Sequence, residues 1–188
     1  LRGLRGSGMN IYTWTQFFRG FGGDFFVDFP NDMHPTVNTP EAVEAVNYYA
    51  GLLQNFGPAD VASYTNLDIQ NAQMSGAIAI TMDANVFATI VEDPQTSSTA
   101  GKWGYAMVPS GEGGQWPSIY SHIMCINNFT DAKEAAWLFI EWATSPEITL
   151  KRGLATGVPA RKSTWESEEF VEQLSYVGGG TYVDVCLE

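Results

Sequence analysis

The polar residues Asp83 and Asn85 stand directly after an almost wholly apolar run, residues 77–82. That run has the composition of a strand covered on both faces, and Gly76 before it suits the C′ position of a preceding helix. In open α/β sheets the ligand lies just past the carboxyl ends of the strands. The sequence therefore predicts a binding site at this tip, where a carboxylate accepts hydrogen bonds and an amide both donates and accepts them.

The elements that must position this site include a helix with a clear start signal, Thr39-Pro40-Glu41. Thr is a good N-cap, Pro suits the first helical position, and an acid in the first turn favours the helix dipole. Gly57-Pro58 is expected to end this helix. Its apolar residues recur at three- and four-residue steps, which predicts one buried face. The members of that face are Ala42, Val46, Tyr49, Leu53 and Phe56.

Other helices are predicted in both halves of the chain. They cover residues 10–18, 65–75 and 86–91, and another begins at Ser167. Asp131-Ala-Lys-Glu134 resembles a capping box and opens a helix through Ala143, with an apolar stripe wide enough to need partners on two sides. Ser145-Pro146-Glu147 starts a further helix, which Gly153 is expected to stop.

Two more strands are predicted besides residues 77–82, at residues 103–108 and 119–126. Strands alternating with helices indicate the α/β class. Cys125, in the last of these strands, is expected to be a buried small hydrophobe. The Gly-rich residues 110–115 lack a Lys-Ser/Thr pair and a following helix, so we interpret them as a flexible crossover and not as a phosphate-binding loop.

The composition excludes several kinds of partner. A formal net charge of −12 with nine basic residues argues against nucleic acid and anionic lipid, because neutralising phosphates takes clustered Lys and Arg. No apolar run reaches the roughly 18 residues of a membrane span. His34 has no second ligand at metal spacing, and no cofactor is expected.

Aromatic residues make up 13% of the chain, and their flat faces suit the C–H faces of sugar rings.

The order of these elements resembles the sugar- and polyol-binding proteins of bacterial ABC importers, the extracellular solute-binding proteins of family 1. Three segments carry the resemblance: the helix start at residues 38–49, the helix-to-strand passage at 73–82, and Gly-Val-Pro-Ala-Arg-Lys-Ser at 157–163. The joint order extends over nearly the whole of residues 5–170. Within residues 73–82 the chain departs from the usual pattern, because Met74 replaces a Phe and Ile80 a Met.

The resemblance implies a type II periplasmic-binding-protein-like fold with two lobes. Residues 1–108 would form most of the C-terminal lobe, residues 109–156 would cross to the absent N-terminal lobe, and residues 157–188 would return. Since the chain begins with Leu1 and is about half the usual family length, we expect it to be an excised fragment.

The same resemblance implies a function and a set of ligand contacts. The protein would capture a sugar or polyol in the cleft between the lobes and deliver it to permease subunits, in the periplasm or outside the cell, with or without a lipid anchor. No bond would be broken. Arg5 would lie near the stacking aromatics. The implied contacts are Tyr12, Trp14 and Tyr120 as stacking aromatics, and Asp83, Asn85, Ser121, His122 and Arg161 as hydrogen-bonding groups.

Two alternatives remain open on the sequence. A glycoside hydrolase would use a pair of carboxylates, and an acidic chain offers many, although most of them lie at helix starts or on solvated faces. A Ser nucleophile is less supported, since there is no Gly-x-Ser-x-Gly elbow. The other alternative is a structural piece that cannot bind ligand without the rest of its cleft. Each polar candidate could equally be an ordinary loop or cap residue.

Overall fold

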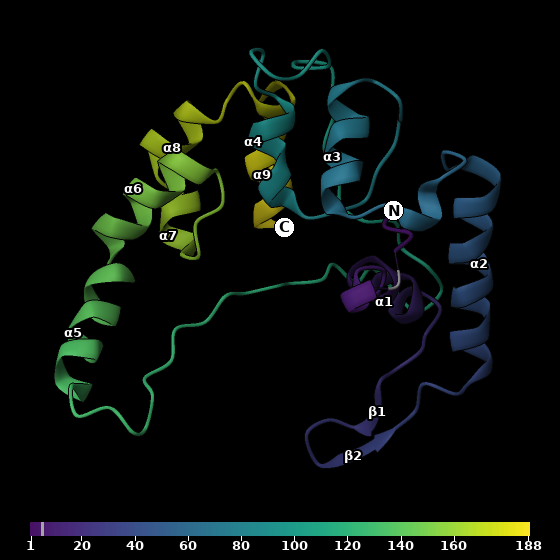
Figure 1. Ribbon diagram of the computed structural model, residues 1–188, viewed down its shortest axis with the longest axis horizontal. Coiled ribbons are helices and arrows are strands. Elements are labelled where there is room, and N and C mark those ends of the chain that lie inside the picture. Colours follow the sequence, from purple (N-terminus) through teal and green to yellow (C-terminus); the bar gives the residue numbers. More distant parts are fainter. Residues whose placement is uncertain (5) are drawn as a thin grey trace. The chain divides into compact units, whose positions relative to one another are not determined.

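The computed structural model describes every residue except Arg5, which therefore lies outside the described part of the chain (Figure 1). The chain divides into two compact units, residues 1–84 with 107–119, and residues 85–106 with 120–188. The α-helices are α1 (Ile11–Gly20), α2 (Pro40–Phe56), α3 (Asn66–Met74), α4 (Ala88–Val91), α5 (Lys133–Ala143), α6 (Pro146–Thr156), α7 (Lys162–Trp165), α8 (Glu168–Gln173) and α9 (Thr181–Leu187). The strands are β1 (Phe26–Asp28) and β2 (Asp32–Pro35), and short 3-10 turns are η1 (Gly6–Gly8), η2 (Val61–Ser63), η3 (Asn85–Phe87) and η4 (Val177–Gly180).

In the first unit, α1 packs on α2 around a fully buried Phe18. The predicted start of α2 is confirmed, because the Thr39 hydroxyl accepts the Ala42 N–H at 3.4 Å. The predicted buried face is partly wrong: Val46 is 51% and Phe56 83% exposed. Since α1 covers only one side of α2, burial is confined to a narrow stripe. That stripe comprises Ala42, Ala45 and Tyr49.

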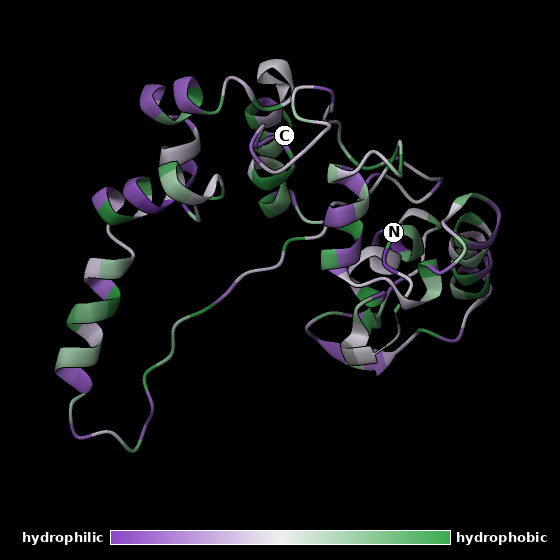
Figure 2. Cartoon of the chain, turned by 45° about the horizontal axis from the view of Figure 1, so that its top comes forward, coloured by the Kyte–Doolittle hydropathy of each residue, from purple (hydrophilic) through white to green (hydrophobic). Residues whose placement is uncertain are grey.

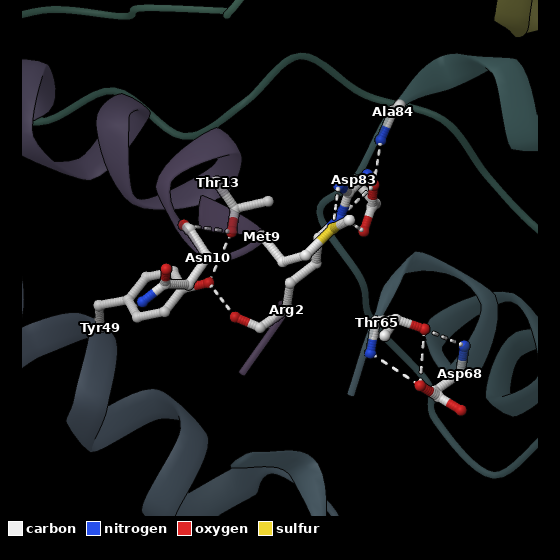
Figure 3. A network of polar contacts seen from close by, with 9 residues as sticks. All are labelled: Arg2, Met9, Asn10, Thr13, Tyr49, Thr65, Asp68, Asp83 and Ala84. Carbon is white, nitrogen blue, oxygen red and sulfur yellow. Dashed lines mark hydrogen bonds and ion pairs between the residues drawn. The ribbon is translucent and has the colours of Figure 1, made fainter. Parts of the chain in front are cut away.

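The helix before the candidate tip, α3, begins and ends as expected. Thr65 and Asp68 form a reciprocal capping box, and the backbone N–H of Thr65 lowers the pKa of the Asp68 carboxyl (Figure 3). At the other end Gly76 has φ +75°, and the Ala77 N–H donates to the Ala72 carbonyl at 2.9 Å. The end of α3 is thus a Schellman motif with glycine at C′.

The three predicted strands are wrong. Residues 77–82, 103–108 and 119–126 form no strand, and Ile80 and Ile119 are 90% and 91% exposed. A strand needs a neighbour to receive its backbone hydrogen bonds, and within the described residues the only sheet is the antiparallel pair β1–β2. Cys125 is accordingly exposed, not buried. The described chain is mostly helical with little sheet.

The Gly-rich residues 110–115 include a turn that packs against the end of α1, and their role as a flexible crossover stays a prediction. Gly111 and Gly114 form a β-bridge, and the Gly113 N–H donates to the Gly20 carbonyl of α1 at 2.8 Å. The approach is so close that a Cβ on Gly113 would lie 2.4 Å from the Gly22 nitrogen. The end of α1 therefore holds this turn in place.

In the second unit, α6 begins at the expected N-cap, where the Ser145 hydroxyl accepts the Ile148 N–H at 3.4 Å. It does not stop at Gly153 but continues to Thr156, before Gly157 with φ +75°. Gly153 is buried, and a Cβ there would lie 3.1 Å from Pro159 and 3.3 Å from Phe170. This glycine allows close packing inside the helix instead of ending it.

The helix α5 forms as predicted, but without the expected capping box. Its N-cap is Ala132, and no side chain caps it. Four of its large apolar side chains are 56–58% exposed, and Figure 2 shows hydrophobic stretches along α5 between hydrophilic ones. These side chains are Trp137, Leu138, Phe139 and Trp142.

The core of the second unit gathers around Phe170 and Tyr182, which are fully buried. Glu92 is also buried, and its carboxylate accepts the backbone N–H groups of Gly101 and Gly178. No helix within the described residues is long and apolar enough to cross a membrane.

Candidate ligand-binding site

The predicted site residue Asp83 forms an ion pair with Arg2 in the first unit (Figure 3). Arg2 Nε donates to both carboxylate oxygens, at 3.1 Å and 2.9 Å, and Nη2 donates to Oδ1. The two side chains are only 10% and 4% exposed. The Asp83 hydrogen bonds raise the pKa of the Arg2 guanidinium. A fork of this geometry fixes the orientation of both groups.

The Tyr49 hydroxyl holds the backbone of Arg2, and the Thr13 hydroxyl holds the hydroxyl of Tyr49. The Tyr49 hydroxyl donates to the Arg2 carbonyl at 2.6 Å and also pairs with the Thr13 hydroxyl (Figure 3). Tyr49 and Thr13 are buried, and burial raises the pKa of Tyr49 to about 12. The helices α1 and α2, which supply these hydroxyls, thereby position a guanidinium that lies outside both of them.

The guanidinium also meets an aromatic ring and a sulfur atom. The Arg2 guanidinium carbon lies 5.3 Å from the ring centroid of Tyr12, which is 38% exposed. Arg2 Nη1 donates to the Met9 sulfur at 3.6 Å, and a thioether is a weak acceptor. Arg2 therefore joins two of the predicted site residues, Tyr12 and Asp83, into one cluster.

Trp14 lies in the aromatic core of the first unit. Its ring stacks on Phe18, with centroids 5.0 Å apart and planes 7° apart, and meets Phe25 edge-on. It also lines a hollow of about 410 Å³ between α1 and α2, to which Tyr49 contributes. These contacts account for Trp14 by packing, and its role in stacking on a ligand stays a prediction.

The predicted residues of the second unit occupy separate places. Asn85 donates to the Cys186 sulfur at 3.4 Å, and its carbonyl accepts the Tyr182 hydroxyl at 3.2 Å. Arg161 Nε donates to the Thr144 carbonyl at 2.7 Å. The side chains of Asn85 and Arg161 are exposed. Each engages its own partners, and the structure does not bring them into contact with each other.

Tyr120, Ser121 and His122 lie in the extended segment before α5 and are exposed. The rings of Tyr120 and His122 meet edge-on with centroids 5.1 Å apart. The described residues hold no group of three or more His, Cys, Asp or Glu side chains that could bind a metal ion. What the arrangement offers chemically is hydrogen bonding and aromatic surface.

Sequence reasoning missed Arg2 and the hydroxyl of Tyr49. Arg2 stands in the Gly-rich start of the chain, 81 positions before Asp83, and no local pattern marks such a pair. One signal was present: an acid at the end of an apolar run needs a counter-charge if it is buried, and the chain has only nine basic residues to supply one.

Comparison with known families gives the class of this chain, which is that of the solute-binding proteins. The family described as bacterial extracellular solute-binding protein matches residues 1–149, and the chain belongs to that family. The family is non-enzymatic, which excludes the glycoside hydrolase alternative and indicates a periplasmic or extracellular protein.

Relatives and solved structures agree with this family. The chain is 29% identical to a mannitol-binding protein of Pseudomonas aeruginosa, over all of this chain and 42% of that protein. A solute-binding protein of Agrobacterium radiobacter K84 in complex with ribitol is 27% identical, with a TM-score of 0.75 over 97% of this chain and 46% of that one. The maltose-bound MalE3 protein of T. maritima, at 24% identity, has a TM-score of 0.76 over 95% of this chain and 46% of that one.

The chain thus spans under half the length of these proteins. The structural likeness is to type II periplasmic binding proteins over part of their chain. The predicted likeness to type II periplasmic binding proteins is therefore confirmed over part of their chain, whereas the described residues are mostly helical with little sheet and do not show the predicted α/β class.

Proposed function

We propose that the whole protein is the solute-binding component of a bacterial ABC importer, and that it captures a polyol or sugar and delivers it to membrane permease subunits. The observation that carries this proposal is the family match over residues 1–149, together with a mannitol-binding relative and a ribitol complex at 29% and 27% identity. Binding and release, without bond cleavage, are the chemistry of this function.

The cluster around Arg2 suits such a solute. A polyol presents hydroxyls that both donate and accept, so it needs carboxylate acceptors and guanidinium donors in fixed places, as Asp83 and Arg2 provide. The ring of Tyr12 adds a flat face for the C–H groups of the carbon chain. Trp14, Asn85, Tyr120, Ser121, His122 and Arg161 complete the set of contacts in this proposal.

The proposal includes the arrangement of lobes that the sequence predicted. Residues 1–108 and 157–188 belong to the C-terminal lobe, and residues 109–156 cross to the other lobe. The exposed apolar side chains of Ile119 and of α5 lie within that crossing segment, and contact with the rest of the whole protein would bury them. A lipid anchor that holds the whole protein at the membrane is also part of this proposal.

The test is the thermal stability of the whole protein with D-mannitol, ribitol and maltose. A solute that binds the folded state stabilises it by mass action, by about 2.7 kcal/mol at a concentration 100 times the dissociation constant. We expect the melting temperature to rise with one or more of these solutes, and the solute to be recovered unchanged. Absence of any rise across the panel, or release of a product, would contradict the proposal.

A further inference from the structure

We infer that the β1–β2 hairpin is a docking surface for a partner protein that presents an arginine flanked by apolar side chains. Such docking is separate from the proposed function and does not depend on which solute the protein binds. Figure 1 shows the hairpin on the stretch of chain between α1 and α2, extending away from both helices. Its features are exposed apolar side chains, a hollow beside them and two facing carboxylates.

The apolar part of this surface is formed by two phenylalanine rings and a valine. Phe29 and Val27 are 68% and 59% exposed, and Phe26 is half-buried. The rings of Phe26 and Phe29 lie with centroids 6.1 Å apart and planes at 34°. Apolar side chains gathered on one exposed element mark an interaction surface, whereas single scattered ones do not.

A hollow of about 490 Å³ lies beside these rings and is lined by residues 24–29 and Arg19. This volume falls within the range of about 300–1,000 Å³ that is usual for ligand pockets. The cation at the hollow is already engaged, since Arg19 Nη1 pairs with Asp24 at 2.5 Å and the guanidinium lies 4.0 Å from the ring centroid of Trp116. The other carboxylate of the lining, that of Asp28, forms no ion pair within the described residues.

Asp28 and Asp32 are register partners across the hairpin. Like charges directly opposite each other destabilise a strand pair. Each carboxylate accepts one hydrogen bond from its own turn, from the Asn31 amide at 3.1 Å and from the His34 backbone N–H at 2.9 Å. Residues 24–38 contain three Asp and no Lys or Arg. A cation supplied from outside the chain would therefore remove an uncompensated repulsion.

An arginine of a partner protein fits this combination best. A guanidinium donates in a planar fork to carboxylates and also stacks on aromatic rings, so it can engage Asp28 and Phe29 together. Neighbouring apolar side chains of the partner would cover the remaining surface of Phe26 and Val27. A second copy of this chain would instead bring acids against acids, with a net charge of −12 on each copy.

The experiment selects peptides from a random displayed library on the immobilised whole protein and titrates the enriched peptides in solution, with and without EDTA. We expect these peptides to share an arginine next to apolar residues. Replacing that arginine by citrulline, which keeps the length of the side chain but removes its charge, should weaken binding at least about 10-fold. This comparison uses the wild-type protein, so it does not depend on the folding of any variant.

Two variants place the peptide on the hairpin. Asp28→Asn/Asp32→Asn removes both carboxylates and Phe29→Ser removes the exposed ring, and each should weaken binding at least about 10-fold. Two matched controls should stay within about 2-fold of the wild type. They are Glu147→Gln/Glu169→Gln, which removes two exposed carboxylates of the second unit, and Phe56→Ser, which removes a ring of α2 that is 83% exposed.

Several results would overturn the inference. One is that no peptide is enriched, or that the enriched peptides lack arginine or bind the hairpin variants as tightly as the wild type. Another is loss of peptide binding in EDTA, which would assign Asp28 and Asp32 to a metal ion. A third is dimerisation of the whole protein that Phe29→Ser abolishes, since the hairpin would then contact a second copy of this chain.

Discussion

At the scale of the residue, the Tyr49 hydroxyl connects α1, α2 and the backbone of Arg2. Tyr49→Phe removes this hydroxyl and leaves the buried Arg2 carbonyl without its donor, so we expect the free energy of unfolding to fall by about 1–3 kcal/mol. The measurement is urea denaturation. Tyr48→Phe is the matched control, since Tyr48 is 50% exposed, and its cost should stay within about 0.5 kcal/mol. Equal costs for the two variants would contradict the account.

The same tyrosine predicts a loss of stability at high pH. Burial raises the pKa of Tyr49 from 10.0 to about 12, and burial also raises the pKa of Tyr105 and Tyr182. Because the neutral phenol is favoured in the folded state, its stabilising effect is complete below pH 10 and is lost as the pH rises toward 12. We expect the melting temperature to fall across that window, with phenolate absorbance lagging behind that of exposed tyrosines. Ionisation of all tyrosines near pH 10 in a folded chain would refute this.

The residue scale also shows which members of the candidate cluster the sequence could suggest and which it could not. Asp83 could be found because a polar residue at the end of an apolar run is a local feature. Arg2 could not, because its partner is 81 positions away and the pairing depends on the folded path of the chain. A pattern of neighbouring residues cannot predict a contact between positions so far apart in the sequence.

At the scale of the element, the sequence predicts helices better than strands. A few adjacent residues determine the helix starts at Thr39 and Ser145 and the Schellman motif at Gly76. The local sequence is therefore enough to predict these helix ends. A strand depends on a neighbour that local sequence does not supply, and residues 77–82 and 119–126 find none within the described chain. The prediction that Gly153 ends α6 is wrong for a similar reason, because the close packing around this glycine involves residues outside the helix.

The true end of α6 gives a prediction at this scale. Gly157 has φ +75°, and a Cβ there would lie 2.4 Å from Thr89 Cγ2. Gly157→Ala should therefore lower the free energy of unfolding by about 2–3 kcal/mol, from left-handed strain and the collision together. Gly179→Ala is the control, because Gly179 has φ +63° with nothing within 4 Å, and only the strain of about 1 kcal/mol is expected. Denaturation curves that coincide for both variants would speak against this cause.

At the scale of the whole molecule, the exposed apolar segments predict a difference between the 188-residue chain and the whole protein. Ile119 and Ile123 are 91% and 82% exposed and belong to no strand. If the rest of the whole protein covers residues 119–126, their amides should exchange hydrogen at least about 10-fold more slowly there than in this chain. The amides of α2 serve as the internal reference. Equal exchange of residues 119–126 in both proteins would contradict the proposed arrangement of lobes.

Isothermal titration calorimetry of the whole protein with D-mannitol and ribitol tests polyol binding at the Arg2–Asp83 cluster directly. We expect saturable binding of at least one of them at a single site, with the solute recovered intact and with affinity lost in Asp83→Ala but kept in Glu147→Gln. Saturable binding that survives Asp83→Ala would remove the site from the Arg2–Asp83 cluster. No binding heat for polyols or sugars at any accessible concentration would contradict the proposed function itself.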